Sequence, residues 1–269
     1  MTTAHRDAAL EARLKERLRG CCFGGTIHAF STCDSTMERA HALAGAGAGE
    51  GTLVFAARQT EGRGRLGRTW ESPDGGAYFS LILKPARPVA ETPQLSLVAG
   101  LAAAEALKEL TGLSPAIRWP NDLLLDGRKI AGILTEVSSV RDPRFTNHER
   151  RSYMVLGVGI NVTTDPNDLP DTATSLAACG AACDPYRLVA TLCSKLDGWY
   201  DIWTAQGFAP IRAALRPWLS HVGDIVRVRV GSDHIEGTAQ DVDERGRLLI
   251  RLDSGLMRAM EMGEVGLLR

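Results

Sequence analysis

Hydrophobic residues recur at helical spacing in several parts of the chain. Between residues 7 and 18 they fall on Ala9, Leu10, Leu14 and Leu18, which form one face of a short amphipathic helix. Further helices are predicted after Ser35 and over 94–110, 185–206 and 208–216. The 94–110 segment, QLSLVAGLAAAEALKEL, is apolar on all faces, so we expect it to pack in the middle of a domain.

The predicted helix after Ser35 carries a start signal. Ser35 or Asp34 can cap its first turn, and Glu38 stands where a capping box places its acid. Such a pair satisfies backbone N–H groups that the first turn leaves without partners. The Gly/Ala run AGAGAGEG then ends this helix and turns the chain.

Strand signals alternate with these helices. Buried strands are predicted for TLVFAARQ (52–59), AYFSLILKP (77–85) and YMVLGVGINV (153–162). The dipeptide Asp126-Gly127 separates a Leu-rich run from an Ile-rich run, which predicts a tight hairpin. The polar stretch SSVRDPRFTNHERR (139–152) is predicted to project as a solvated loop.

The pattern changes near residue 220. From there to the end, short runs alternate apolar and polar residues between Gly and Asp turns, which is typical of a small all-β barrel. So short a segment has a marginal core of its own, so we expect it to dock against the rest of the chain. The sequence therefore predicts two domains: residues 1–220, with a mixed β-sheet and packed helices (α/β, α+β), and residues 221–269, the barrel.

Composition narrows the function. The 269 residues carry a formal net charge of −1, whereas a protein that mainly binds DNA or RNA usually has a basic excess. No 18-residue apolar run predicts a membrane span, and the first residues do not form a signal peptide, so a cytoplasmic protein is expected. The six cysteines form no C-x-x-C pair, which argues against a zinc site and a disulfide framework.

The stretch QTEGRGRLGRTW (59–70) concentrates arginines among glycines. Its glycines match G-x-G-x-x-G, but Pro73 follows shortly and no helix opens, so a dinucleotide fingerprint is rejected. No G-K-[ST] follows either, which excludes a Walker loop. Three interpretations remain for this arginine loop: an anion-binding loop, a solvated basic loop and a nucleic-acid patch.

Two further polar clusters interrupt apolar sequence. Asn121, Asp122 and Lys129 stand in RWPNDLLLDGRKIAGIL (118–134), and Asn161 follows two glycines in GVGINV (157–162). Each cluster is a weak signal alone, because a lysine after a tight turn is usually a surface residue. Together with DST at 34–36 and the arginine loop, in this order, they resemble the catalytic domain of biotin protein ligases.

The resemblance extends from about residue 26 to the end of the chain, since the tail resembles the family's SH3-like C-terminal domain. It implies a class II synthetase-like, biotin–lipoate ligase catalytic domain followed by an SH3-like β-barrel. The family's optional N-terminal DNA-binding domain has no counterpart here, so the ligase-only type is expected.

The resemblance also implies an activity. Such an enzyme makes biotinyl-5′-AMP from biotin and MgATP, then transfers biotin to one lysine of a biotin carboxyl carrier domain of an acyl-CoA carboxylase. ATP and Mg²⁺ are therefore expected to act with biotin as substrate, without a tightly bound protein metal site and with no legible Mg²⁺ ligands. No DNA or membrane partner is expected, and the protein is expected to be a monomer or a weak homodimer.

Site residues follow from the resemblance position by position. It implies that the following bind biotin: Ser35, Thr36, Gln59, Gly62, Arg63 and Lys129. It implies that the following bind ATP or the adenylate: Arg65, Arg68, Trp70, Asn121, Lys129 and Asn161. Lys129, Arg65 and Asp122 are the expected catalytic residues, with Asp122 as base or orienter for the acceptor lysine.

Alternatives stay open at this point. A lipoate–protein ligase or octanoyltransferase resembles biotin ligases in fold, although the transferase needs a reactive cysteine and only Cys33 lies beside a motif. A non-enzymatic nucleic-acid-binding module could use the arginine loop and the barrel, with a steep salt dependence. Leu66 departs from relatives that carry a basic or aromatic residue there, which implies a less basic loop and weaker retention of the intermediate.

Overall fold

A mixed β-sheet forms the centre of the larger part of the molecule. The computed structural model describes residues 5–141 and 150–268, and among these, seven strands pair in the order β1-β2-β3-β7-β6-β5-β4. The strands are β1 (Ile27–Cys33), β2 (Leu53–Gln59), β3 (Gly76–Leu83), β4 (Ala116–Arg118), β5 (Asp122–Leu125), β6 (Arg128–Arg141) and β7 (Arg150–Asn161). Only β1 and β2 run parallel; the other neighbours are antiparallel.

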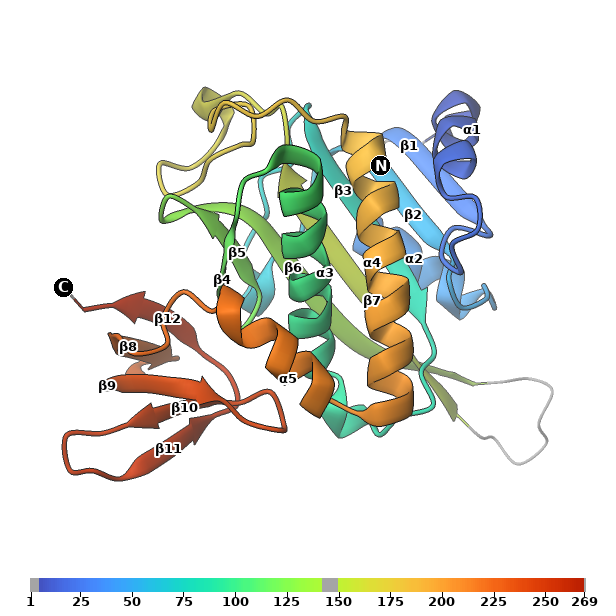
Figure 1. The fold of residues 1–269 in the computed structure, drawn as a ribbon. Coiled ribbons are helices and arrows are strands. Elements are labelled where there is room, and N and C mark those ends of the chain that lie inside the picture. The colour runs from blue at the N-terminus through green and yellow to red at the C-terminus, as the bar shows by residue number, and fades with distance from the viewer. Residues whose placement is uncertain (1–4, 142–149, 269) are drawn as a thin grey trace.

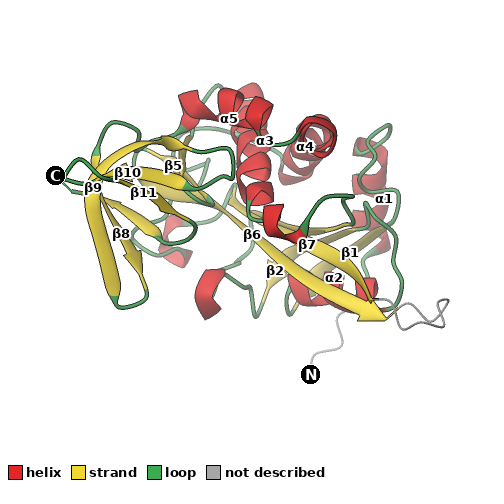
Figure 2. Ribbon diagram, turned by 90° about the horizontal axis from the view of Figure 1, so that it is seen from below, coloured by secondary structure: helices red, strands yellow, loops and turns green. Residues whose placement is uncertain are grey.

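Helices cover the two faces of this sheet unequally. Figures 1 and 2 show α3 and α4 packed side by side on one face, with α2 on the other. The helices are α1 (Ala8–Arg17), α2 (Thr36–Gly45), α3 (Gln94–Thr111), α4 (Pro185–Gln206) and α5 (Ala209–Leu215). The predicted helices are thus confirmed, and α3 is buried along most of its length as its apolar composition predicts.

Strand alternation divides the side chains of β7 between the two faces. Leu156, Val158 and Ile160 belong to the core under α3 and α4. Gly157 and Gly159 fall on the opposite face, because successive side chains of a strand point to opposite sides. On that face the space beside the two glycines is taken by the side chains of Met37 and Trp70, which lie directly against the strand.

The capping box predicted at the start of α2 is wrong. Ser35 is the N-cap residue, but its side chain makes no capping hydrogen bond, and its buried Oγ has no hydrogen-bond partner among the described residues. Glu38 forms an ion pair with Arg63 instead. The charged guanidinium of Arg63, distant in the sequence, has replaced the backbone N–H at the start of α2 as the partner of Glu38.

The hairpin predicted at Asp126-Gly127 is confirmed. The two residues join β5 to β6 with φ values of 49° and 76°, the left-handed conformation that a two-residue turn of this kind requires. The loop predicted over 139–152 is wrong at both ends, because β6 and β7 stay paired from Ser139–Ser152 to Arg141–Arg150. Backbone pairing continues there without an apolar side-chain pattern; residues 142–149 lie outside the described residues.

The tail forms a second, antiparallel sheet in the order β11-β10-β9-β8-β12. Its strands are β8 (Ile225–Val230), β9 (Asp233–Val242), β10 (Leu248–Arg251), β11 (Met257–Met260) and β12 (Glu264–Leu267). The expected docking is present: Trp119 Nε1 donates to the Gly246 carbonyl at 2.9 Å, and Arg212 pairs with Asp241 at 2.8 Å. The division at residue 220 stays a prediction.

In the part of the chain that the structure describes, no helix combines the length and the apolar character needed to cross a membrane.

Candidate active site

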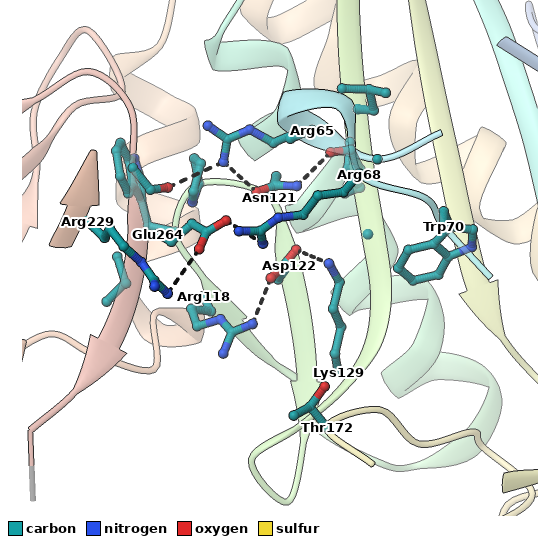
Figure 3. A pocket seen from close by; sticks show the side chains of 18 of the residues that line it. Arg65, Arg68, Trp70, Arg118, Asn121, Asp122, Lys129, Thr172, Arg229 and Glu264 are labelled. Atoms are coloured by element: carbon teal, nitrogen blue, oxygen red, sulfur yellow. Dashed lines mark hydrogen bonds and ion pairs between the residues drawn. The ribbon is translucent and has the colours of Figure 1, made fainter. Parts of the chain in front are cut away.

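A pocket with a volume of about 780 Å³ opens where the arginine loop, the sheet and the C-terminal sheet meet. Figure 3 shows side chains from all three parts pointing into it. Of the described residues that line it, seven are Arg or Lys and three are Asp or Glu. The pocket therefore has a positive balance that suits an anionic ligand, although the chain as a whole is close to neutral.

Two glycines of the sheet form a flat surface for the Trp70 indole. A Cβ at Gly159 would lie 2.5 Å from Trp70 Nε1, and one at Gly132 would lie 2.9 Å from Trp70 Cζ3. Real Cβ atoms do not approach so closely, so both positions require glycine. The Lys129 ammonium lies 5.1 Å from the centroid of the same indole, within cation–π range.

One end of the pocket carries a chain of uncharged hydrogen bonds, which we call the uncharged end: Thr36, Gln59, Ser72 and Ser80. Gln59 Oε1 accepts from the Thr36 backbone N–H at 2.7 Å and from Thr36 Oγ1 at 3.1 Å. Gln59 Nε2 donates to Ser72 Oγ at 2.8 Å, and Ser80 Oγ donates to Thr36 Oγ1 at 2.9 Å. Each amide and hydroxyl therefore has a fixed orientation.

Arg63 lies beside the uncharged end and is held by two acids. It pairs with Glu38 of α2 and donates to Glu136 Oε1 of β6 at 2.8 Å. The other oxygen of Glu136 lies 2.9 Å from His41 Nε2. An anion that approaches Arg63 must therefore compete with two carboxylates.

The opposite end of the pocket is built from charges, and we call it the charged end: Arg65, Arg68, Arg229 and Glu264. Arg65 Nη1 donates to Asn121 Oδ1 at 2.9 Å and to the Gly263 carbonyl at 3.4 Å. Burial lowers the pKa of Arg65 from its ordinary value. Arg68 pairs with Glu264, the first residue of β12.

Lys129 stands between the two ends on β6. Its ammonium lies 2.7 Å from Asp122 Oδ1, and Arg118 Nη2 donates to Asp122 Oδ2 at 2.8 Å. The hairpin at Asp126-Gly127 brings Asp122 and Lys129 together, because it pairs β5 with β6, while the pairing of β4 with β5 places Arg118 opposite Asp122. Asp122 thus orients the Lys129 ammonium toward the pocket and partly neutralises the charges of both Lys129 and Arg118.

The expected site residues divide into two groups. The following line the pocket: Thr36, Gln59, Arg63, Arg65, Arg68, Trp70, Asn121, Asp122 and Lys129. Ser35, Gly62 and Asn161 lie behind its wall. A Cβ at Gly62 would be 2.3 Å from the Trp70 carbonyl, and Asn161, 1% exposed, donates from Nδ2 to the Thr174 carbonyl at 3.0 Å.

Several lining or supporting residues were missed from the sequence. Ser72 and Ser80 orient the uncharged end, while Arg118 supports Asp122. Arg229 and Glu264 come from the C-terminal sheet. The strand alternation around Arg229 signals that it is exposed, but not which surface it faces.

The cysteine beside a motif does not suit nucleophilic chemistry in this geometry. Cys33, the cysteine beside a motif, is buried, and this burial raises its pKa to about 12. Its thiol therefore keeps its proton at neutral pH, which argues against the nucleophile of an octanoyltransferase. Within residues 5–141 and 150–268, no three His, Cys, Asp or Glu side chains gather to hold a metal ion.

Comparison with known proteins decides the family. Residues 30–161 match the Biotin/lipoate A/B protein ligase family, and residues 221–268 match the Biotin protein ligase C terminal domain. A biotin–[acetyl-CoA-carboxylase] ligase of Mycobacterium tuberculosis is 34% identical over 252 residues, 89% of each chain. The chain belongs to the biotin protein ligase family. As a member of this family it is an enzyme of the ligase class.

Other biotin ligases agree with this assignment. The bifunctional ligase/repressor BirA of Bacillus subtilis is 35% identical over 92% of this chain and 76% of its own length. The biotin protein ligase from Aquifex aeolicus, solved in complex with biotin and ATP, superposes with a TM-score of 0.76 at 29% identity. That comparison covers 91% of this chain and 99% of the Aquifex chain.

Proposed function

We propose that this biotin ligase makes biotinyl-5′-AMP from biotin and MgATP and then transfers the biotinyl group to a lysine of a biotin carboxyl carrier domain. The observation that carries the proposal is the arrangement of one pocket, which joins a neutral hydrogen-bonding end to a charged end through Lys129. The solved Aquifex relative with biotin and ATP, and relatives named for acetyl-CoA carboxylase, support the substrates.

The uncharged end suits the ureido ring of biotin. That ring presents a carbonyl acceptor and two N–H donors, and Thr36 and Gln59 offer a hydroxyl and an amide. The buried Oγ of Ser35 has no partner among the described residues and lies next to Thr36. Gly62 contributes by allowing the backbone to pass close to Trp70 and Gln59.

The arginine loop suits the carboxylate and the phosphates. Arg63 follows the uncharged end, so it would meet the carboxylate of biotin after releasing Glu38. Arg65 and Arg68 would bind the nucleotide, and Trp70 offers a flat indole for a base or ring. Asn121 and Asn161 would supply polar groups to the nucleotide, with Asn161 acting from behind the wall.

The first step joins the biotin carboxylate to the α-phosphate of ATP and releases pyrophosphate. Two anions must approach each other, so positive charge at the point of contact lowers the barrier. Lys129 would contact both the carboxylate and the α-phosphate after leaving Asp122, and Arg65 would lie on the phosphate side. Mg²⁺ would enter as part of the MgATP substrate.

The second step is attack of an acceptor lysine amine on the biotinyl carbonyl, with AMP as the leaving group. An ammonium is not a nucleophile, so the lysine must first lose a proton. Once Lys129 has left Asp122 to contact biotinyl-5′-AMP, Asp122 would orient the acceptor amine or accept its proton. No protein nucleophile is needed for either step.

The test is pyrophosphate release by the purified protein with ATP and, separately, biotin, lipoate or octanoate. Biotin alone is expected to support release, and a carrier domain added afterwards should gain one biotinyl group on a lysine, measured by mass spectrometry. Release with lipoate instead of biotin would overturn the substrate, and silence with all three would overturn the activity.

A further inference from the structure

Glu264 connects the arginine loop to the C-terminal sheet. Its carboxylate pairs with Arg68 of the loop, while Arg229 Nη2 of β8 lies 3.4 Å from Glu264 Oε2. Figure 3 shows Glu264 between the guanidinium groups of Arg68 and Arg229. One acid thus neutralises two cations that come from different parts of the chain.

The backbone fixes this arrangement. Glu264 and Arg229 are register partners in the antiparallel pair of β12 and β8. Gly263 precedes Glu264 with φ of 146°, and a Cβ there would lie 2.5 Å from Val228 Cγ1. Only glycine fits this turn, which also presents the Gly263 carbonyl to Arg65 at 3.4 Å.

Arg229 is less firmly engaged than its neighbour Arg227, although both line the pocket. Arg227 Nε donates to Glu236 at 2.6 Å. The contact of Arg229 with Glu264 is long, and its side chain is 66% exposed. An exposed ion pair of this kind contributes at most about 1 kcal/mol, so a multiply charged phosphate can displace it.

We propose that Arg229 is a phosphate-binding residue of the biotin ligase, which takes the β- and γ-phosphates of ATP and the pyrophosphate product, with Glu264 holding it in place before the nucleotide binds. The inference rests on the proposed function. Arg63, Arg65 and Lys129 are engaged by the carboxylate and the α-phosphate in that function. The next two phosphates need cations further along the charged end, where Arg68 and Arg229 lie.

Glu264 then acts as a competitor as well as a holder. While it neutralises Arg68 and Arg229, it opposes anion binding; when phosphates arrive, both guanidinium groups exchange a carboxylate for phosphate oxygens. Removal of Arg229 and removal of the Glu264 charge should therefore change pyrophosphate affinity in opposite directions. If these contacts only held the arginine loop against the C-terminal sheet, the affinity for pyrophosphate would fall in both variants.

Calorimetric titration with inorganic pyrophosphate and Mg²⁺ tests the proposal without relying on catalysis. Arg229→Ala is expected to bind pyrophosphate roughly tenfold more weakly than the wild type, with unchanged biotin affinity. Glu264→Gln should bind it roughly threefold more tightly. Arg251→Ala is the matched control, since Arg251 is an exposed arginine of the same sheet that does not line the pocket.

Equal pyrophosphate affinity in the wild type and Arg229→Ala would overturn the inference, as would weaker binding by Glu264→Gln. Melting temperatures of all variants exclude misfolding as the cause, and Arg229→Lys should recover part of the lost affinity. Pyrophosphate release from ATP with biotin is measured on the same wild-type sample. Its absence would count against the proposed function alone, because the titration reports on Arg229 independently.

Discussion

At the uncharged end of the pocket, Gln59 and Thr36 make neutral hydrogen bonds that each use a defined donor and acceptor. At the charged end, Arg68 and Arg229 share one acid, and their side chains are mostly exposed. Both ends belong to one pocket, yet one is held by directional bonds and the other by exchangeable charges.

The difference follows from what each end has to recognise. A neutral, polar ring is recognised by the positions of its hydrogen-bond donors and acceptors. A buried donor or acceptor that lacks a partner costs binding free energy, so the protein fixes the positions of its own donors and acceptors before the ring binds. Phosphates carry charge that arrives and departs during turnover. Exposed ion pairs are weak enough to exchange, and the shared carboxylate of Glu264 reduces the repulsion between Arg68 and Arg229.

The junction of the two ends should show the largest effect. Lys129→Ala removes the cation that both reacting anions meet, so we expect pyrophosphate release to fall by about two to three orders of magnitude. Lys15→Ala, on an exposed face of α1, is the control. Normal release by a folded Lys129→Ala protein, shown by its circular dichroism, would remove Lys129 from the reaction.

The next largest effect is expected outside the pocket, on the stability of the fold, at a buried histidine that does not line the pocket. His221 is 1% exposed, and burial, aided by Arg118 and opposed by Asp224, lowers its pKa from 6.5 to about 4. The unfolded chain therefore binds a proton that the folded chain rejects between pH 6.5 and about 4, and stability falls as the pH falls through this window. The loss should reach roughly 3 kcal/mol.

Urea unfolding at pH 7.5 and pH 4.5 measures this loss in the wild type and in His221→Phe. The variant should lack most of the loss, because phenylalanine does not titrate. An equal slope of unfolding free energy against pH in both proteins would show that His221 is not the group responsible.

The uncharged end should respond through substrate affinity. Ser80→Ala removes the donor to Thr36 Oγ1 and leaves this hydroxyl held only by its hydrogen bond to Gln59. We expect the KM for biotin to rise roughly fivefold, with kcat and the KM for ATP nearly unchanged. Ser96→Ala, which removes a hydroxyl bonded to Thr135 outside the pocket, is the control. A loss confined to kcat would contradict the positioning role.

The smallest effect is expected at Arg63, a charged residue that lies beside the uncharged end. Glu38→Gln removes one of the two carboxylates that compete for this arginine, so the KM for biotin should fall about twofold. Glu16→Gln changes the same charge on an exposed face of α1. A rise in KM for Glu38→Gln would instead make Glu38 a residue that positions Arg63.

The helices and most strands could be predicted from the sequence because their signals are local. The apolar face of α1, the all-apolar α3 and the Asp126-Gly127 turn each depend on spacing within a few residues. The failed predictions depended on partners that are distant in the sequence. Glu38 forms an ion pair with Arg63 instead of a capping box in its own helix. The two ends of the predicted loop 139–152 are strand residues, because β6 pairs with β7 there.

For the site, the sequence by itself determined the residue types: an arginine loop, a lysine after a hairpin turn, and glycines where the indole lies. Resemblance to a family then assigned their expected roles. Which charges neutralise one another was decided only by tertiary structure, because ion pairs such as Arg68–Glu264 and Arg63–Glu136 join residues far apart in the chain. Coulomb attraction depends on distance in space, which spacing along a sequence does not encode.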